Sequence, residues 1–246
     1  MKELKAAIIL PKYLNANGDR GNILMLKQRA EVNNVKFSVD SIDVGENFKA
    51  EDYDFYYIGG TPDEFNPIAT KEILSKKELF SEIKELSKTI FGVCFGYQIL
   101  GNKYMFDDKR QISCLGLLDF FTVQKNKRRV GNVTAKMNFM SPNYLVGFEN
   151  HTGATCLNRG VLPLSYVDKG FGNNGSDKTE GAILGNIIGT YLTGPVLPRN
   201  VYFADYLLKV TMETKYQEQF DTVDEANTLE EDVHFDFINA KYWLNN

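Results

Sequence analysis

Apolar and polar positions alternate in two different ways along the first hundred residues of the chain. Short apolar runs predict strands at residues 6–10, 35–44, 55–58 and 90–93. Between these runs, apolar residues recur at helical spacing over 22–30 and over 68–86, and many Lys and Glu lie on the outer side of the second stretch. The rhythm predicts a parallel sheet with helices on both faces and with sites at the carboxyl ends of its strands.

The second half of the chain is richer in strand patterns. Strands are predicted at residues 115–124, 130–140, 144–148 and 183–192. We expect them to add antiparallel strands to the parallel core, which gives an α/β fold with a mixed sheet. After Pro198 and Asn200, apolar residues on one face predict a helix that continues to Tyr216.

The composition changes again from about residue 217. Residues 217–233 contain seven acidic side chains and no Lys or Arg, which indicates a solvated stretch. Apolar residues capable of docking follow, namely Phe235, Phe237, Ile238, Tyr242 and Trp243. We expect a single domain over residues 1–246 with a C-terminal helical extension from about 217. This extension is a candidate surface for a partner or a second copy, and the alternative is a helix packed on its own domain.

The overall composition removes several classes of function. A formal net charge of -4 without a long basic run gives no electrostatic basis for binding nucleic acid. No window approaches the roughly 18 to 20 apolar residues that span a bilayer, so we expect a cytoplasmic protein without membrane insertion. The three cysteines show no paired metal spacing and leave one odd thiol, which favours a reducing compartment. We expect no metal site and no cofactor.

Cys94 is the most informative single residue. A β-branched and aromatic run ends at this cysteine, and a helical pattern begins directly after it, which predicts a nucleophile elbow. Such a turn lifts the side chain clear of the sheet, and the helix N-terminus favours thiolate over thiol. A thiolate placed there can attack an acyl carbon. The alternative is a buried structural cysteine at a strand end, because free cysteine is among the most buried residue types.

Six segments of the chain carry a family resemblance and follow one another in the family order. They lie at residues 14–22, 57–60, 92–98, 147–153, 170–174 and 189–200. With these segments the chain resembles the class I glutamine amidotransferases of the CobB/CobQ-like group. Within that group it is most similar to the glutaminase subunits, called GatD, of lipid II isoglutaminyl synthase. The resemblance implies a flavodoxin-like class I glutamine amidotransferase domain.

The resemblance also implies a chemistry for the cysteine. Cys94 would attack the side-chain amide of L-glutamine and form a γ-glutamyl thioester, releasing ammonia and then glutamate. The matched oxyanion donors are the backbone N–H of Phe95 and one near Gly60, and Gln98 belongs to the same matched segment. The general base of the family is a histidine that protonates the departing ammonia.

An arginine is expected to bind the carboxylate of glutamine. Arg128 aligns approximately with the family arginine in this role, and a guanidinium fork suits that anion. Arg129 is the neighbouring alternative. Arg128 can also be an ordinary surface charge on a strand.

The chain departs from the family pattern at three places. The histidine of the family sequence Tyr-Leu-His-Gly-Pro is replaced by Thr193, whose hydroxyl cannot take up a proton near neutral pH. Loss of a general acid or base typically costs about 10²–10⁴-fold in rate. Phe95 replaces a glycine and can fill the glutamine pocket or disturb the oxyanion N–H. Pro62, in the loop after Gly60, lacks an N–H.

The chain has only two histidines as candidates to replace the missing imidazole. His151 matches a family histidine that is not the base, and a hydrogen-bonded structural role is expected for it. His234 follows the acidic stretch, where a surface role is expected. The loop at 170–175 is expected to close one wall of the site, and the alternative is a mobile turn built from Gly and Asn.

Two classes of function remain open from the sequence. One is a glutaminase that passes ammonia to a ligase of the Mur type, which amidates the α-carboxyl of D-glutamate in a peptidoglycan precursor. The other is a degenerate amidotransferase kept as a binding or scaffolding subunit. Cys94 favours the first, whereas Thr193, Phe95 and Pro62 favour the second. A weaker third hypothesis gives Cys94 another acyl chemistry, with a different base or with substrate assistance.

Overall fold

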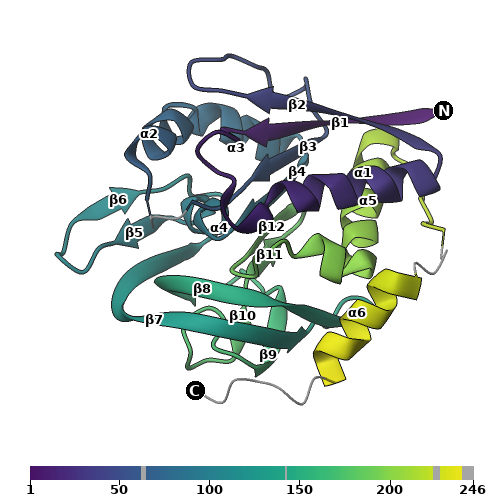
Figure 1. The fold of residues 1–246 in the computed structure, drawn as a ribbon. Helices are drawn as coiled ribbons and strands as arrows, with labels where there is room; N and C mark the ends of the chain where they lie inside the picture. The colour runs from purple at the N-terminus through teal and green to yellow at the C-terminus, as the bar shows by residue number, and fades with distance from the viewer. Residues whose placement is uncertain (62–64, 142, 224–227, 240–246) are drawn as a thin grey trace.

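A computed structural model describes residues 1–61, 65–141, 143–223 and 228–239. Its central feature is a six-stranded sheet in the order β11-β12-β4-β3-β1-β2 (Figure 1). The strands are β1 (Lys2–Ile9), β2 (Val35–Ile42), β3 (Phe55–Ile58), β4 (Thr89–Val93), β11 (Ala182–Leu184) and β12 (Ile187–Thr190). Neighbouring strands are parallel, except that β11 runs antiparallel to β12. The parallel strands follow the flavodoxin-like order, so the predicted fold class is confirmed.

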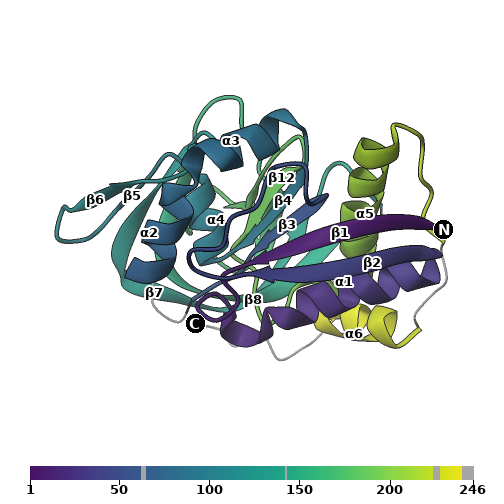
Figure 2. The ribbon, with the colours of Figure 1, turned by 90° about the horizontal axis from the view of Figure 1, so that it is seen from above.

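Helices cover both faces of this sheet, as Figure 2 shows from above. The helices of the core are α1 (Arg20–Val32), α2 (Pro67–Ser75), α3 (Lys77–Glu85), α4 (Phe95–Leu100) and α5 (Val201–Tyr216). On β1, Ala6 and Ile8 pack in one core cluster with α1 and α5, whereas Ala7 and Ile9 pack in another with α2, α3 and α4. Successive side chains of a strand point to opposite faces, so a strand buried on both faces reads as a continuous apolar run.

A second sheet lies against the first (Figure 1). It has the order β10-β9-β7-β5-β6, and β8 pairs with β7. Its strands are β5 (Lys103–Met105), β6 (Gln111–Ser113), β7 (Phe120–Lys136), β8 (Tyr144–Leu157), β9 (Ser165–Lys169) and β10 (Thr179–Glu180). Val133, Ala135 and Leu145 of β7 and β8 enter the same cluster as α1 and α5, so the second sheet is joined to the core by apolar packing.

Several predicted boundaries were wrong. The single strand predicted at 183–192 is the hairpin of β11 and β12, which turns through Gly185 at φ +56°. The helix predicted over 68–86 is divided into α2 and α3 at Lys76, whose φ and ψ of -106° and 21° are not helical. The strands predicted at 115–124 and 130–140 form one strand, β7, with an irregularity between Gln124 and Arg129. Of the expected antiparallel strands, only β11 joins the first sheet.

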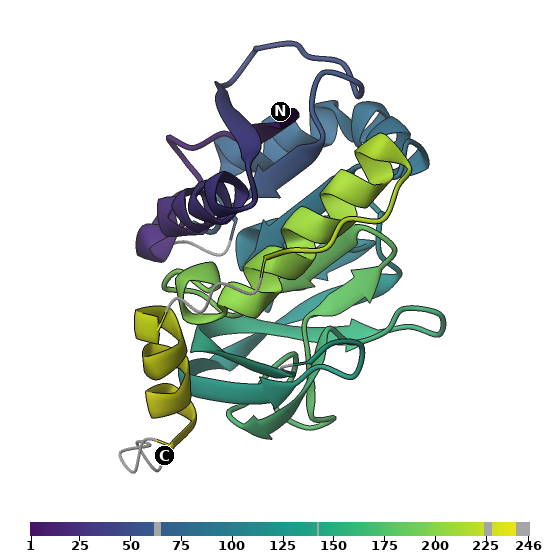
Figure 3. The same ribbon diagram turned by 90° about the vertical axis from the view of Figure 1, so that its right-hand side faces the viewer.

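The C-terminal helix packs on its own chain. The helical part begins later than predicted, at α6 (Thr228–Asn239), and lies beside the 3-10 turn η2 (Leu197–Arg199; Figure 3). His234 Nδ1 lies 2.7 Å from the carbonyl oxygen of Arg199, and the Arg199 guanidinium lies over the ring of Phe237. Phe235 is 48% exposed, while Tyr242 and Trp243 lie outside the described residues. No helix in the described ranges is long and apolar enough to cross a membrane.

A buried ion pair joins α1 to α5. Arg29 Nε and Nη2 donate to the two carboxylate oxygens of Asp205 at 2.7 and 2.9 Å. The Arg29 side chain is only 2% exposed, and its Nη2 also donates to the carbonyl oxygen of Val223 at 3.1 Å. Breaking such a pair from one side leaves a charge in a poorly solvated place.

We expect Asp205→Ala to lower the free energy of unfolding by about 3–5 kcal/mol, because it removes the carboxylate from the buried Arg29 guanidinium. Chemical denaturation measures this difference. The matched control is Asp108→Ala, which removes the exposed partner of Arg110 and should change the free energy of unfolding far less, because water screens an exposed pair. Equal losses in the two variants would contradict the assigned importance of the buried pair.

Candidate functional site

The backbone at Cys94 makes the sharp turn that the sequence predicts between β4 and α4. Cys94 has φ 52° and ψ -108°, a combination that costs free energy for a residue with a side chain. The glycines on either side permit the turn. A Cβ on Gly96 would lie 1.9 Å from the carbonyl oxygen of Ile58, and one on Gly92 would lie 2.5 Å from that of Gly96. α4 can therefore approach β3 closely only with glycine at these positions.

The turn brings Cys94 to groups from the neighbouring strands. A Cβ built on Gly60, which follows β3, would lie 3.2 Å from Cys94 Cβ. The sulfur lies 3.4 Å from the carbonyl oxygen of Tyr191, just after β12, and a Thr193 side-chain hydrogen bond reaches it as well. Thr193 is held by its own N–H, which donates to the Phe148 carbonyl oxygen of β8 at 2.8 Å. The structure thus gathers the predicted Cys94, Gly60 and Thr193 at one place.

The thiol is protonated in this environment at neutral pH. Burial raises the pKa of Cys94 to about 12, and the negative charge of Asp19 acts in the same direction. The Thr193 hydrogen bond and the positive charge of Arg128 oppose this rise without cancelling it. Burial and a nearby carboxylate thus act against the thiolate that the sequence predicts at this helix N-terminus.

Phe95 is packed in the core. Its ring is 2% exposed and lies edge-on to Phe65 at a centroid distance of 5.1 Å. Phe65 in turn contacts Tyr104 and Phe106. The prediction that this side chain can fill the glutamine pocket is not supported, because the ring is part of an aromatic cluster. The Phe95 N–H stands at the first position of α4, where an amide has no acceptor within its own helix.

The two arginines of the basic cluster have different surroundings. Arg128 lies in the irregular part of β7, donates from Nε to Asn150 Oδ1 at 2.6 Å and acts electrostatically on Cys94. Arg129 donates from Nη2 to the carbonyl oxygen of Asn174 at 2.7 Å. Arg129 therefore holds the loop at 170–175, whereas Arg128 remains the guanidinium whose charge reaches the thiol.

The other two predicted polar groups belong to a buried network. Gln98 Nε2 donates to the hydroxyl of Tyr191 at 3.3 Å, and that hydroxyl shares a 2.7 Å hydrogen bond with Thr155. The imidazole of His151 stacks on Tyr191 with ring centroids 3.7 Å apart, and its Nδ1 lies 2.8 Å from the Gly153 carbonyl oxygen. Burial lowers the pKa of His151. These contacts are those of a structural histidine.

The loop at 170–175 is anchored to this network. Glu149 on β8 accepts hydrogen bonds from the N–H groups of Phe171 and Gly172 at 2.7 and 2.9 Å. The Asn173 amide donates to the Gly181 carbonyl oxygen at 2.9 Å. These hydrogen bonds hold the loop in one position. Pro62, the third predicted departure, lies outside the described residues.

Asp19 is a site residue that the sequence reasoning missed. It is 1% exposed, and its Oδ2 accepts the Gly60 N–H at 2.7 Å, so the expected oxyanion donor near Gly60 is already engaged. Burial raises the pKa of Asp19 to about 6. The residue lies in the first matched segment, but an aspartate just before a helix usually indicates a cap. Here its side chain makes no capping hydrogen bond to α1.

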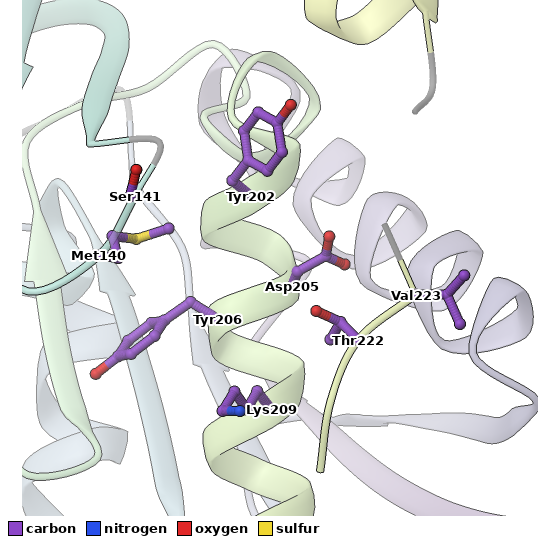
Figure 4. A pocket seen from close by; sticks show the side chains of 8 residues that line it. All are labelled: Met140, Ser141, Tyr202, Asp205, Tyr206, Lys209, Thr222 and Val223. Carbon is purple, nitrogen blue, oxygen red and sulfur yellow. The ribbon is translucent and has the colours of Figure 1, made fainter. Parts of the chain in front are cut away.

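We also searched the described residues outside this site for metal ligands and pockets. No group of His, Cys, Asp and Glu in the described ranges can hold a metal ion. One pocket lies between α5 and the segment at 222–223 (Figure 4). Its lining comprises Met140, Ser141, Tyr202, Asp205, Tyr206, Lys209, Thr222 and Val223. It shares no residue with the surroundings of Cys94.

Comparison with known proteins agrees with this geometry. The family model of the CobB/CobQ-like glutamine amidotransferase domain matches residues 5–201. The chain is 39% identical over 215 residues to the lipid II isoglutaminyl synthase (glutamine-hydrolyzing) subunit GatD of Staphylococcus aureus (strain N315), with 87% of each chain covered. It is 30% identical over 240 residues to the GatD subunit of Streptococcus pneumoniae (strain ATCC BAA-255 / R6), covering 97% of this chain and 92% of that one.

A solved structure gives the same fold at low identity. A glutamine amidotransferase from Thermotoga maritima superposes with a TM-score of 0.55 at 16% identity, covering 94% of each chain. This likeness concerns the fold alone. From the family match and the two relatives, the chain belongs to the CobB/CobQ-like glutamine amidotransferase family.

We expect Cys94 to be alkylated slowly by iodoacetamide at neutral pH. Its rate constant should rise about tenfold per pH unit from pH 7 to 10 without a plateau, because a thiol with a pKa of about 12 holds little thiolate there. Peptide-level mass spectrometry follows each cysteine separately, and Cys156, which is partly exposed like Cys94, is the internal comparison. A plateau below pH 8 at Cys94 would show an activated thiolate instead.

Proposed function

We propose that this chain is the glutamine-hydrolysing subunit of a lipid II isoglutaminyl synthase. The observation that carries the proposal is the Cys94 turn, where a strained nucleophile position lies beside Gly60 and Thr193. The two GatD relatives support it, because they match most of this chain's length and most of their own. The substrate would be L-glutamine, and the reaction would take place in the cytoplasm.

The side chains of the site would divide the work as follows. The sulfur of Cys94 attacks the side-chain amide carbon of glutamine and forms the thioester. The Phe95 N–H stabilises the oxygen that becomes negative, with the Gly60 N–H as a second donor once Asp19 releases it. Arg128 binds the α-carboxylate of glutamine through its guanidinium. Without an imidazole at position 193, we expect the chemical step to be slow by about 10²–10⁴-fold.

The ammonia would pass to a Mur-ligase-like synthetase subunit that amidates the D-glutamate of a peptidoglycan precursor. Free ammonia becomes ammonium in water, so a bound partner must receive it directly. α6 offers a surface for such a partner, because Val233 and Phe235 are 43% and 48% exposed. The acidic residues before it favour a partner surface with positive charge.

A second function has its own supporting observation. Thr193 and the protonated thiol together describe a site that binds glutamine without turning it over. The chain would then be a binding or scaffolding subunit of the same complex. The two functions differ in whether ammonia is released in a way that depends on Cys94.

We expect Thr193→His to raise glutamine hydrolysis by about 10²-fold or more over the wild-type chain, because it restores an imidazole beside the thiol. Ammonia release is measured with and without the coexpressed ligase. Cys94→Ala should abolish turnover. Tyr166→His places a histidine on the exposed face of β9 and should change nothing. If neither the wild-type chain nor Thr193→His releases ammonia with the ligase present, the glutaminase function is wrong and the binding function stands.

We expect Arg128→Ala to raise the KM for glutamine by about 10–100-fold with a smaller change in kcat, because it removes a charged hydrogen bond of about 1.5–3 kcal/mol to the substrate carboxylate. The measurement can be made in the Thr193→His background. Lys127→Ala, which removes the exposed neighbouring charge, is the control and should leave KM unchanged. Unchanged KM in both variants would assign glutamine binding elsewhere.

A further inference from the structure

We propose that Asp19 accepts the proton of the Cys94 thiol. A carboxylate then takes the role of the imidazole that is missing at position 193. The proposal rests on the glutaminase function proposed above. Asp19 and Cys94 both lie beside Gly60. A Cβ placed on Gly60 would lie 3.2 Å from Cys94 Cβ and 3.5 Å from Asp19 Oδ2. A proton acceptor must be within hydrogen-bond reach of the proton, directly or through one water molecule.

The topology explains why these groups meet. Asp19 lies between β1 and α1, while Gly60 follows β3 on the way to α2. β1 and β3 are neighbours in the sheet, and the helices that follow them pack on opposite faces. The two connections therefore diverge, and a crevice opens at such a point in α/β sheets. Asp19 lies beneath this point, 1% exposed, at the same edge of the sheet as the Cys94 turn.

The contacts of Asp19 leave one oxygen for chemistry. Oδ2 accepts the Gly60 N–H at 2.7 Å, but Oδ1 is buried and has no hydrogen-bond partner among the residues that the structure describes. An unpartnered buried carboxylate oxygen is costly, and nothing in the local fold requires it. The hydroxyl of Tyr57 lies near the carboxylate and is itself held by the Asn22 amide at 2.8 Å. Asp19 is therefore held through Oδ2, while Oδ1 stays buried beside the Tyr57 hydroxyl without a hydrogen bond of normal geometry from the described residues.

The proton transfer also frees a donor. As Cys94 Sγ bonds to the amide carbon, the S–H bond breaks, its proton moves to Asp19 Oδ1, and the carbonyl π electrons move to the oxygen. Asp19 becomes neutral and holds the Gly60 N–H less strongly, so this N–H can turn to the new oxyanion. When the carbon–nitrogen bond breaks, the Asp19 proton passes to the leaving nitrogen and gives ammonia. Water then attacks the thioester, and its proton returns through Asp19 to the sulfur.

The protonation states of the two groups fit this sequence. With a pKa of about 6, Asp19 is a carboxylate at pH 7 and is close to the optimum for a general base. The thiol has a pKa of about 12, so complete transfer before attack is unfavourable by about a million-fold. The proton must therefore move during the attack, which agrees with slow turnover.

Other titratable and charged groups lie near Asp19 and Cys94, and a test must distinguish their effects from that of Asp19. Tyr57 of β3 faces Asp19, and Arg20 is its neighbour in the chain. Glu180, whose pKa burial raises to about 7, and Arg128 act on the thiol. A pH profile alone does not distinguish Asp19 from Glu180, so a substitution at Asp19 is needed.

The decisive variant is Asp19→Asn, whose side-chain oxygen can still accept the Gly60 N–H. It is made in the full chain and assayed with the ligase. We expect ammonia release to fall by about 10²–10⁴-fold. We expect alkylation of Cys94 at pH 8 to become about threefold to tenfold faster, because removal of a nearby negative charge lowers the thiol pKa. Asp168→Asn on the exposed part of β9 is the control and should alter neither rate.

The two readouts move in opposite directions, which a general loss of structure does not produce. If Asp19→Asn does not fold, the pH dependence of kcat/KM is compared between the wild-type chain and Asp19→Glu. In the wild-type chain kcat/KM should rise as the pH passes through about 6, and the midpoint of this rise should shift in Asp19→Glu. Turnover within twofold of wild type in Asp19→Asn, or the same pH profile in Asp19→Glu, overturns the role of Asp19 and leaves the glutaminase function intact. No Cys94-dependent turnover in the wild-type chain overturns the role of Asp19, and no turnover in Thr193→His as well overturns the glutaminase function itself.

Discussion

The close approach of α4 to β3 is the constraint on which the site depends. Gly96 lies so near the Ile58 carbonyl that no side chain fits between them, and Gly92 is equally confined by Gly96. This contact forces the chain to turn within one residue, and that residue is Cys94 at φ 52°. The strain is maintained because β4 is buried on both faces and cannot relax. A nucleophile is thus fixed by packing before any catalytic group is considered.

The same sheet order explains which groups the nucleophile meets. β4 lies between β3 and β12, and all three are parallel, so the segments that follow them emerge at one edge. Gly60 arrives from β3 and Thr193 arrives after β12. β8 supports the Thr193 backbone through Phe148, which ties the second sheet to the site. The site is therefore a consequence of topology, whereas its chemistry depends on the few side chains placed there.

This distinction sets what could be predicted from the sequence. The strand before Cys94 and the helix after Asn200 were predicted because apolar periodicity reports burial directly. The β11–β12 hairpin was missed because the apolar residues on either side of Gly185 were joined into one strand, although Gly-Asn between Leu184 and Ile187 is a two-residue hairpin signal. Cys94 and Thr193 were found by motif, but the pKa of the thiol was not, because it depends on burial and on Asp19. The packing of the Phe95 ring was not predicted, because its partner Phe65 lies far earlier in the chain and Phe65 in turn packs on Tyr104.

The electrostatics of the site follow from the absence of an imidazole at position 193. A histidine there can form an ion pair with the cysteine, and the cation would stabilise a thiolate before substrate arrives. A carboxylate has the opposite effect, because its charge and the burial of the thiol both favour the protonated form. In a pair of a thiol and a carboxylate, the proton can move only while the sulfur bonds to the substrate carbon. The new bond removes the negative charge that the sulfur would otherwise carry. Burial and Asp19 raise the thiol pKa, and the missing histidine leaves that rise without an opposing cation, so a site of this kind resists oxidation and alkylation for the same reason that it reacts slowly with glutamine.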